Sequence, residues 1–177
     1  HFPGNGVIRF CESIGVQFGG DLNAYTSIDQ TVYNISNVPT ARESVQDSCL
    51  LILHDWADEV SLLGEEIDKE REVIREEWRT RRDAQTRLWE QQLPKIMPGC
   101  RYANRMPIGD IQVIEGFKPD ELRAYYKKWY RPDLQSIIVV GDIDVDQLEQ
   151  RLKEIFADIP APVNPAERKE ELVADNV

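Results

Sequence analysis

Histidine is almost missing from this chain: among its 177 residues, only His1 and His54 are histidines. Cysteine is also scarce, and Cys11, Cys49 and Cys100 are widely spaced, with no C-x-x-C pair and no histidine at zinc-finger spacing. The sequence therefore excludes a zinc finger. Three buried free thiols, or one disulfide with a spare thiol, are the alternatives for the cysteines.

Long apolar runs and an excess of basic residues are missing too. No hydrophobic stretch approaches the roughly 18 residues that a membrane-spanning helix needs, so we expect no transmembrane segment. The 21 basic residues are outnumbered by 32 acidic ones, and the net charge of −11 argues against a nucleic-acid surface. The chain starts without methionine and shows no signal peptide, so we expect its natural N-terminus to lie upstream.

Hydrophobic spacing predicts a mixture of helices and strands. We expect two extended runs within residues 21–38 and a strand buried on both faces at 134–140. Helices are expected at 7–14, from a capping box at Thr40 and Glu43 to about 60, at 65–92, at 118–129 and at 144–156. Residues 99–116 are expected to be loop with a turn of helix near Asp110.

The predicted helix at 65–92 carries two acids that attract attention. Glu70 and Glu77 lie seven positions apart, on one face, in line with Ile67, Ile74 and Trp78. We expect that face to be buried, and burying an unpaired carboxylate is costly, so each acid needs a partner. An arginine of the same helix and a metal ion are both compatible with the spacing.

Four motifs follow one another along the chain. They are F-G-G-D-L-N-A-Y-T at 18–26, E-R-x-V-I-x-x-E at 70–77, Y-Y-x-x-W-Y-x-P-D at 125–133 and V-V-G-D-I-D at 139–144. In kind and order they resemble the pitrilysin and insulinase family of zinc metallopeptidases. The resemblance runs from residue 2 to about residue 160. Judged by spacing alone, without the resemblance, four aromatic residues are typical of helix packing: Tyr125, Tyr126, Trp129 and Tyr130.

The resemblance implies an α+β fold with a mainly antiparallel sheet packed on one side by helices, which is one half of a repeated pair of such domains. Residues 1–160 would form this metallopeptidase half-domain, incomplete because its first strands and one motif-bearing helix are missing. Residues 161–177 are rich in proline and charge, and we expect them to be a linker toward a second half-domain.

The resemblance also implies a zinc site and a peptide site. In this family an H-x-x-E-H helix supplies two histidine ligands and a glutamate base, and a distant helix supplies a carboxylate ligand. By its position Glu77 resembles that third zinc ligand, and Glu70 resembles the acid that supports the site from behind. Asn23 and Ala24 match the edge strand to which a substrate peptide adds, with Gly20 leaving room.

This chain departs from the family because it contains no H-x-x-E-H motif. We expect the motif upstream of His1, so that the chain alone is inactive and without Zn²⁺, and Glu77 is free of metal or has another partner. His54 lies on an amphipathic helix with no second histidine at metal spacing, and we interpret it as a partly buried or surface histidine.

The leading functional hypothesis is a part of a zinc-dependent peptidase acting on peptides or unfolded proteins, completed by another half-domain of the same or a partner chain. A non-catalytic partner or scaffold subunit of the same family is the alternative, and a module whose acidic helix docks a basic protein is a third. An incomplete sheet also predicts self-association of the fragment. The resemblance favours the bacterial periplasm or cell envelope and leaves the cytoplasm open.

Overall fold

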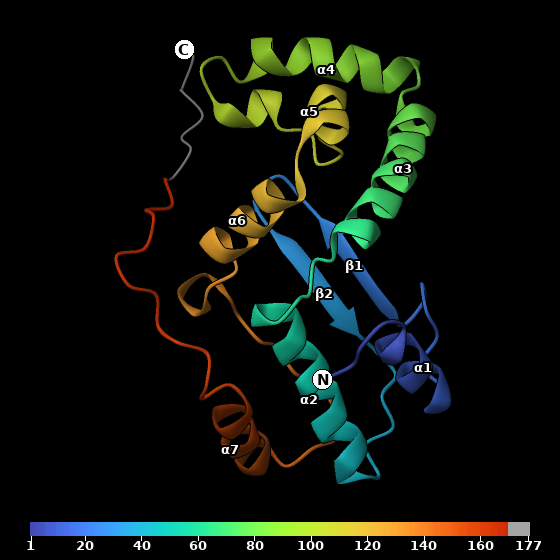
Figure 1. Cartoon of the computed structure of the whole chain (residues 1–177), viewed down its shortest axis with the longest axis vertical. Helices are drawn as coiled ribbons and strands as arrows, with labels where there is room; N and C mark the ends of the chain where they lie inside the picture. Colours follow the sequence, from blue (N-terminus) through green and yellow to red (C-terminus); the bar gives the residue numbers. More distant parts are fainter. Residues whose placement is uncertain (170–177) are drawn as a thin grey trace. The chain divides into compact units, whose positions relative to one another are not determined.

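The computed structural model describes residues 1–169, which form two compact units (Figure 1). The first unit comprises residues 1–25, 31–61 and 126–165. The second comprises residues 26–30 and 62–125, together with the described residues after 165. Helices and strands are both present, and the expected α+β class is confirmed.

The first unit packs helices against a two-stranded antiparallel sheet (Figure 1). Its elements are α1 (Gly6–Ser13), β1 (Leu22–Thr26), β2 (Thr31–Ile35), α2 (Glu43–Asp58), the short helix η2 (Pro132–Leu134) and α7 (Val145–Ile155). Cys11, Val16, Leu22 and Ile52 form its buried core. Because α1, β1 and α2 each bury an apolar side chain there, the core fixes the strand pair against two helices.

The second unit is built from helices. They are α3 (Gly64–Arg81), α4 (Ala84–Ile96), η1 (Arg101–Asn104), α5 (Ile111–Gly116) and most of α6 (Pro119–Trp129). Arg71 of α3 connects α3 to the end of α5, since its guanidinium donates hydrogen bonds to the carbonyl oxygens of Ile114 and, at 2.9 Å, of Phe117. The same guanidinium stacks on the Phe117 ring, 4.0 Å from its centroid.

The single long helix expected at 65–92 is wrong, because the chain breaks between α3 and α4. Asp83 lies at the break in an extended conformation, and its carboxylate accepts a 2.7 Å hydrogen bond from the Thr86 backbone N–H. This contact satisfies a free N–H of a new helix and lowers the pKa of Asp83. The expected end before Pro94 is also wrong, since α4 continues to Ile96.

The capping box predicted at Thr40 is wrong as well. Helix α2 starts two residues later than that box requires, after Arg42, whose side chain makes no capping hydrogen bond. The Thr40 carbonyl instead accepts a 2.7 Å hydrogen bond from the Gln46 side chain. The turn is thus tied down by a side chain within the helix rather than by a hydroxyl at its start.

The buried strand predicted at 134–140 does not form. Beyond η2 this segment joins no sheet in the part of the chain that the structure describes, and its apolar side chains are largely exposed, Val140 by 91%. A strand needs a neighbour to satisfy its N–H and C=O groups, and periodicity reports only the preference of the segment, not the presence of that neighbour.

The remaining predicted elements are confirmed. Helix α1 precedes Gly15, the strand pair lies within 21–38, Asp110 caps α5, and Asp144 caps α7 by accepting a 3.0 Å hydrogen bond from the Gln147 N–H. The part of the predicted linker at 161–169 contains neither helix nor strand, and its remainder lies outside the described residues. None of the described helices has the length and apolar character required to cross a membrane.

The cysteines match the first of the two alternatives, because all three are free and buried. Burial raises the pKa of the Cys49 thiol to about 11. A thiol with a raised pKa stays protonated at neutral pH and is a poor metal ligand and nucleophile. Cys49 therefore serves packing, as does Cys11 in the buried core.

Candidate functional site

The two acids predicted to lie on a buried face of α3 lie at its flank. Ile67 is buried, but Glu70 is exposed and the Glu77 side chain keeps 35% of its accessible surface. At 3.6 residues per turn both acids are rotated roughly 60–80° around the helix from Ile67. The expectation of burial is thus wrong.

The buried face of α3 carries Arg71 in place of the acids. Only 12% of its side chain is exposed, and its charge is satisfied by the carbonyl groups at the end of α5. Glu77 forms a 2.6 Å ion pair with Arg81, one turn further along α3, which is one of the two states expected for it in this chain. An ion pair this exposed contributes little stability, so the Glu77 carboxylate is held only weakly.

The register of the β1–β2 pair determines which backbone groups face outward. Ser27 donates to the Gln30 carbonyl and Ser36 to the Asp21 carbonyl, both at 2.8 Å. Because hydrogen-bonded pairs alternate along an antiparallel ladder, the N–H and C=O of Ala24 point away from β2, toward the outer edge. The Ala24 N–H is occupied by the Asn23 side-chain oxygen at 2.8 Å.

A glycine turn leads into this edge. Gly19 has a φ of +84°, which favours glycine, and a side chain at Gly20 would meet nothing within 4 Å. Asp21 holds the turn, since its carboxylate accepts hydrogen bonds from the Gln17 N–H at 2.9 Å and from the Asn37 amide at 2.6 Å. A Cβ atom at Gly20 would thus lie in open space, and the role of Gly20 in leaving room for a peptide stays a prediction.

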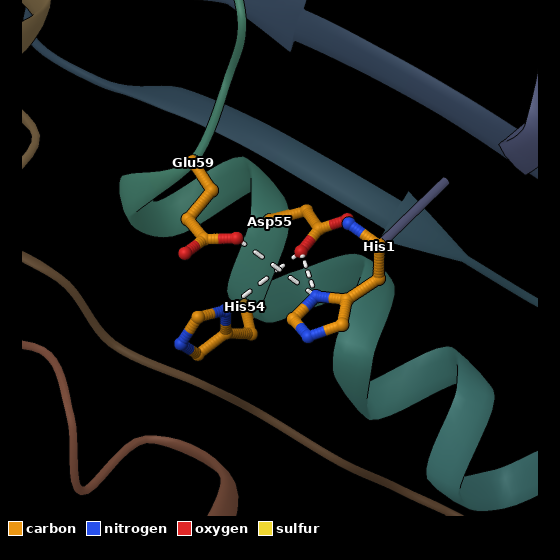
Figure 2. Close-up of side chains that lie close together, drawn as sticks. All are labelled: His1, His54, Asp55 and Glu59. Atoms are coloured by element: carbon orange, nitrogen blue, oxygen red, sulfur yellow. Dashed lines mark hydrogen bonds and ion pairs between the residues drawn. The ribbon is translucent and has the colours of Figure 1, made fainter. Parts of the chain in front are cut away.

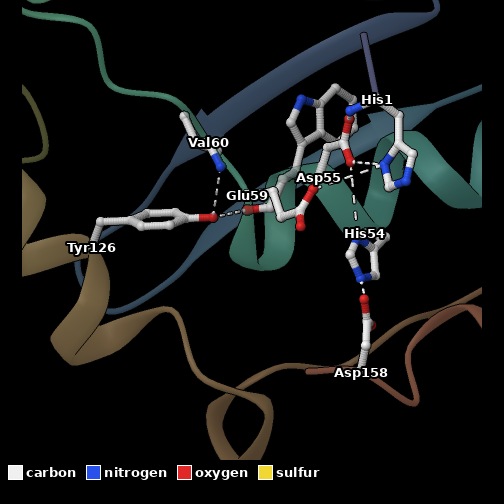
Figure 3. Close-up of polar contacts among 8 residues, drawn as sticks. His1, His54, Asp55, Glu59, Val60, Tyr126 and Asp158 are labelled. Atoms are coloured by element: carbon white, nitrogen blue, oxygen red, sulfur yellow. Dashed lines mark hydrogen bonds and ion pairs between the residues drawn. The ribbon is translucent and has the colours of Figure 1, made fainter. Parts of the chain in front are cut away.

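The predicted aromatic residues are divided between packing and exposure. Tyr126 donates a 2.9 Å hydrogen bond to the Trp56 carbonyl (Figure 3). Its ring centroid lies 4.4 Å from that of Tyr130. Burial raises the pKa of Tyr126 to about 12. Both tyrosines pack as expected, whereas Tyr125 is mostly exposed, which corrects the expectation for that residue.

A second group of polar side chains surrounds the end of α2. His54, expected to be partly buried or at the surface, is almost fully buried, with 2% of its surface exposed. Its Nδ1 lies 3.8 Å from Asp55 Oδ1, and the same oxygen lies 2.5 Å from the Nδ1 of His1 (Figure 2). Glu59 Oε2 lies 3.9 Å from His1 Nδ1. One ligand atom from each of the four residues lies within 4.8 Å of the others.

Sequence reasoning missed this group because His1 and His54 are far apart along the chain. In the folded chain the N-terminal residue lies beside α2, and the centroids of the two imidazole rings are 5.8 Å apart. The available signal was local: Asp55 and Glu59 are four apart, on one helical face, directly beside one of two histidines. Among residues 1–169 this is also the one place where three or more such side chains approach closely enough for a metal ion.

The predicted site residues fall in different units, Gly20, Asn23 and Ala24 in the first and Glu70 and Glu77 in the second. Within the second unit no histidine accompanies the α3 acids in the part of the chain described. Glu77 can supply one carboxylate to a zinc ion, and three protein ligands are needed for a catalytic site. The described residues of α3 therefore fit a part of a zinc site, not a complete one.

Comparison with known proteins places the chain in a family. The family model described as "Insulinase (Peptidase family M16)" matches residues 1–105, and that described as "Peptidase M16 inactive domain" matches residues 116–176. The chain belongs to the insulinase family of peptidases.

The individual relatives are named as proteases. The probable zinc protease PqqL of Escherichia coli is 38% identical over 160 residues, which cover 90% of this chain and 17% of that protein. The crystal structure of the first half of the E. coli periplasmic protease PqqL matches with a TM-score of 0.88 at 36% identity, over 98% of this chain and 36% of that one. A variant of the ferredoxin protease FusC, in complex with Arabidopsis ferredoxin, matches with a TM-score of 0.82 at 27% identity. The match covers 94% of this chain and 18% of that one. The chain thus spans about a sixth of the length of the curated relative.

Proposed function

We propose that this chain is part of a longer zinc-dependent peptidase, in which Glu77 is a carboxylate ligand of the zinc ion and Glu70 supports the site from behind. The observation that carries the proposal is the state of Glu77. It lies on the flank of α3, partly exposed and held by a surface ion pair alone. A carboxylate held in this way can exchange Arg81 for a metal ion at little cost.

The further ligands would come from residues outside this chain. When bound, zinc activates a water molecule and polarises the peptide carbonyl. Glu77 contributes negative charge and a fixed position on a rigid helix. Glu70 precedes it by two turns on the same flank, where its carboxylate is exposed and can accept a hydrogen bond from a ligand of the metal. The chain alone, with one ligand on α3, would not hydrolyse peptides.

The outer edge of β1 is the proposed binding site for the substrate backbone. An added strand would pair with the N–H and C=O of Ala24, because the register turns both groups outward. The Asn23 side-chain oxygen holds the Ala24 N–H until a substrate carbonyl replaces it. The open space beside Gly20 gives an extended peptide room to approach.

The descriptions of the relatives support three further parts of the proposal: protein substrates, a second half of the molecule and a periplasmic location. FusC is described as a ferredoxin protease in complex with ferredoxin, and the PqqL structure is described as a first half. The exposed apolar segment at 135–140 is suited to pairing with further strands of the longer protein, or with a second copy of this chain when it is isolated. PqqL is described as periplasmic, which supports a periplasmic location for the longer protein.

Metal removal tests the proposed activity directly. Dialysis of the longer protein against a chelator is expected to abolish hydrolysis of an unstructured fluorogenic peptide, and stoichiometric Zn²⁺ is expected to restore it. Metal analysis before and after dialysis verifies removal, and a dialysed sample without chelator is the control. Full hydrolysis by metal-free protein would contradict the proposal.

Ala24→Pro tests the edge strand. Proline removes the outward N–H at this position, so we expect roughly a tenfold or larger fall in kcat/KM of the longer protein with its zinc content unchanged. Ala24→Val is the matched control, because it keeps the N–H and suits a strand. Equal kcat/KM values for the proline and valine variants would show that substrate does not pair here.

The match of residues 116–176 to a domain described as inactive favours one second candidate, a non-catalytic subunit of the same family. That candidate predicts a longer protein that binds peptides at the β1 edge but holds no zinc at Glu77 and does not hydrolyse them. The hydrolysis assay on the purified longer protein separates the two candidates.

A further inference from the structure

We propose that His1, His54, Asp55 and Glu59 form a binding site for a divalent transition metal ion, with Zn²⁺ as the best-fitting occupant. None of the four residues has a role in the function proposed above. All belong to the first unit, and three of them lie at the end of α2 (Figure 2).

The state of His54 is the strongest reason for this proposal. Its Nδ1 is buried and has no hydrogen-bond partner among the described residues, and it faces the carboxylate of Asp55 at 3.8 Å, beyond hydrogen-bond distance. A buried polar atom without a partner is costly, and such atoms mark sites where a water or an ion is missing. A cation between this nitrogen and the carboxylate, which already contacts His1, would give the nitrogen its missing partner.

The other nitrogen of the same ring is arranged as in known metal sites. His54 Nε2 lies 2.9 Å from Asp158 Oδ1, on the segment that follows α7 (Figure 3). A carboxylate in this position accepts a hydrogen bond from Nε2–H. The proton then stays on Nε2, and the Nδ1 lone pair is available for a metal ion.

The spacing of the four ligand atoms fits a tetrahedral ion. Zinc bonds of about 2.0–2.1 Å require ligand atoms about 3.4 Å apart. The structure has separations of 2.5, 3.8 and 3.9 Å, and all four atoms lie within 4.8 Å of one another. His1 and Glu59, which are 46% and 49% exposed, can shift to bring these separations to the tetrahedral value.

The chemistry of the donors selects the metal. Two imidazoles suit Zn²⁺, Co²⁺ and Ni²⁺, whereas Ca²⁺ and Mg²⁺ prefer oxygen ligands throughout. The carboxylates of Asp55 and Glu59 would balance the charge of a divalent ion. Such an ion would tie the segment at His1 to α2, and through His54 and Asp158 it would fix α2 against the segment after α7.

Titration of the metal-free chain with Zn²⁺ and Co²⁺ tests the site. We expect binding of one ion per chain, a visible Co²⁺ spectrum without a thiolate charge-transfer band, and shifts of both histidine side-chain NMR signals. His1→Ala and Glu59→Gln, both of exposed side chains, are expected to weaken binding at least about tenfold, and Asp158→Asn roughly 10- to 100-fold. Circular dichroism confirms that each variant remains folded.

Two controls make the result decisive. Glu43→Gln lies on the same helix outside the site, and Glu77→Gln removes the ligand proposed for the peptidase, so both are expected to bind Zn²⁺ as the unaltered chain does. Absence of binding, unchanged binding by His1→Ala and Glu59→Gln, or loss of binding in Glu77→Gln alone would each overturn the proposal. Of these results only the last bears on Glu77, and it would support Glu77 as a ligand, so failure of this site and failure of the proposed function are distinguishable.

Discussion

Replacement of Glu77 by glutamine in the longer protein is expected to lower zinc occupancy of the peptidase site and peptide hydrolysis by more than about 100-fold, since loss of a ligand exceeds the 10- to 100-fold effect of a supporting residue. Glutamine has the same shape but no charge, so the change removes the attraction to the ion while leaving α3 intact. Zinc analysis and kcat/KM measurements on the same preparation check the prediction.

The same substitution should hardly affect folding, because Glu77 loses only its exposed ion pair with Arg81. Glu76→Gln is the matched control, since Glu76 is exposed and paired in the same way, with Arg79 at 2.7 Å. Glu70→Gln is expected to lie between the Glu77 and Glu76 variants, with a kcat/KM lowered roughly 10- to 100-fold. Normal zinc occupancy in the Glu77 variant would remove this residue as a ligand.

Among the substitutions proposed, Arg71→Met should produce the largest loss of stability, about 3 kcal/mol in the free energy of unfolding. The guanidinium is nearly buried and satisfies the carbonyl groups of Ile114 and Phe117, and each group left unpaired costs about 1–3 kcal/mol. Loss of the stacking contact with the Phe117 ring adds about 0.5–1 kcal/mol, partly offset by the apolar methionine side chain. Thermal and urea denaturation followed by circular dichroism measure the effect.

Arg79→Met is the control for Arg71, because its side chain is exposed and makes only a surface ion pair; we expect a change within about 0.5 kcal/mol. Arg71→Lys should lie between the two, since an ammonium group keeps the charge but cannot serve both carbonyl groups with one planar fork. Faster amide exchange confined to α5 would locate the damage. Equal stability of the Arg71 and Arg79 variants would show that the contact with α5 is dispensable.

The elements predicted correctly are those whose signals are local. Helices α1, α6 and α7 and the β1–β2 pair follow from apolar spacing and from glycine or aspartate at their ends. The break between α3 and α4 was also encoded locally, by Asp83 followed three residues later by Thr86, but the continuous run of charged helix formers concealed it. Secondary structure failed where it depends on a partner, as at 134–140, since no periodicity reveals whether a neighbouring strand exists.

The candidate site divides in the same way. Position within the family motifs makes Glu77 and Ala24 candidates, and their roles stay predictions. The burial of α3 was assigned to the wrong residues because a flank roughly 60–80° from the apolar line was taken as its centre, at roughly 100° per residue. The contact between His1 and His54 is a product of tertiary folding. Sequence spacing within one helix contains no information about a histidine more than fifty positions away.

The Asn23 side chain that caps its neighbour's N–H has a consequence for solubility. Unsatisfied strand edges recruit other chains and begin aggregation, and proteins protect them with local devices. At β1 the Asn23 side-chain oxygen occupies the outward N–H of Ala24, so an extended chain would have to displace it before pairing there. A short amide side chain thus satisfies one strand-edge N–H from within the chain itself.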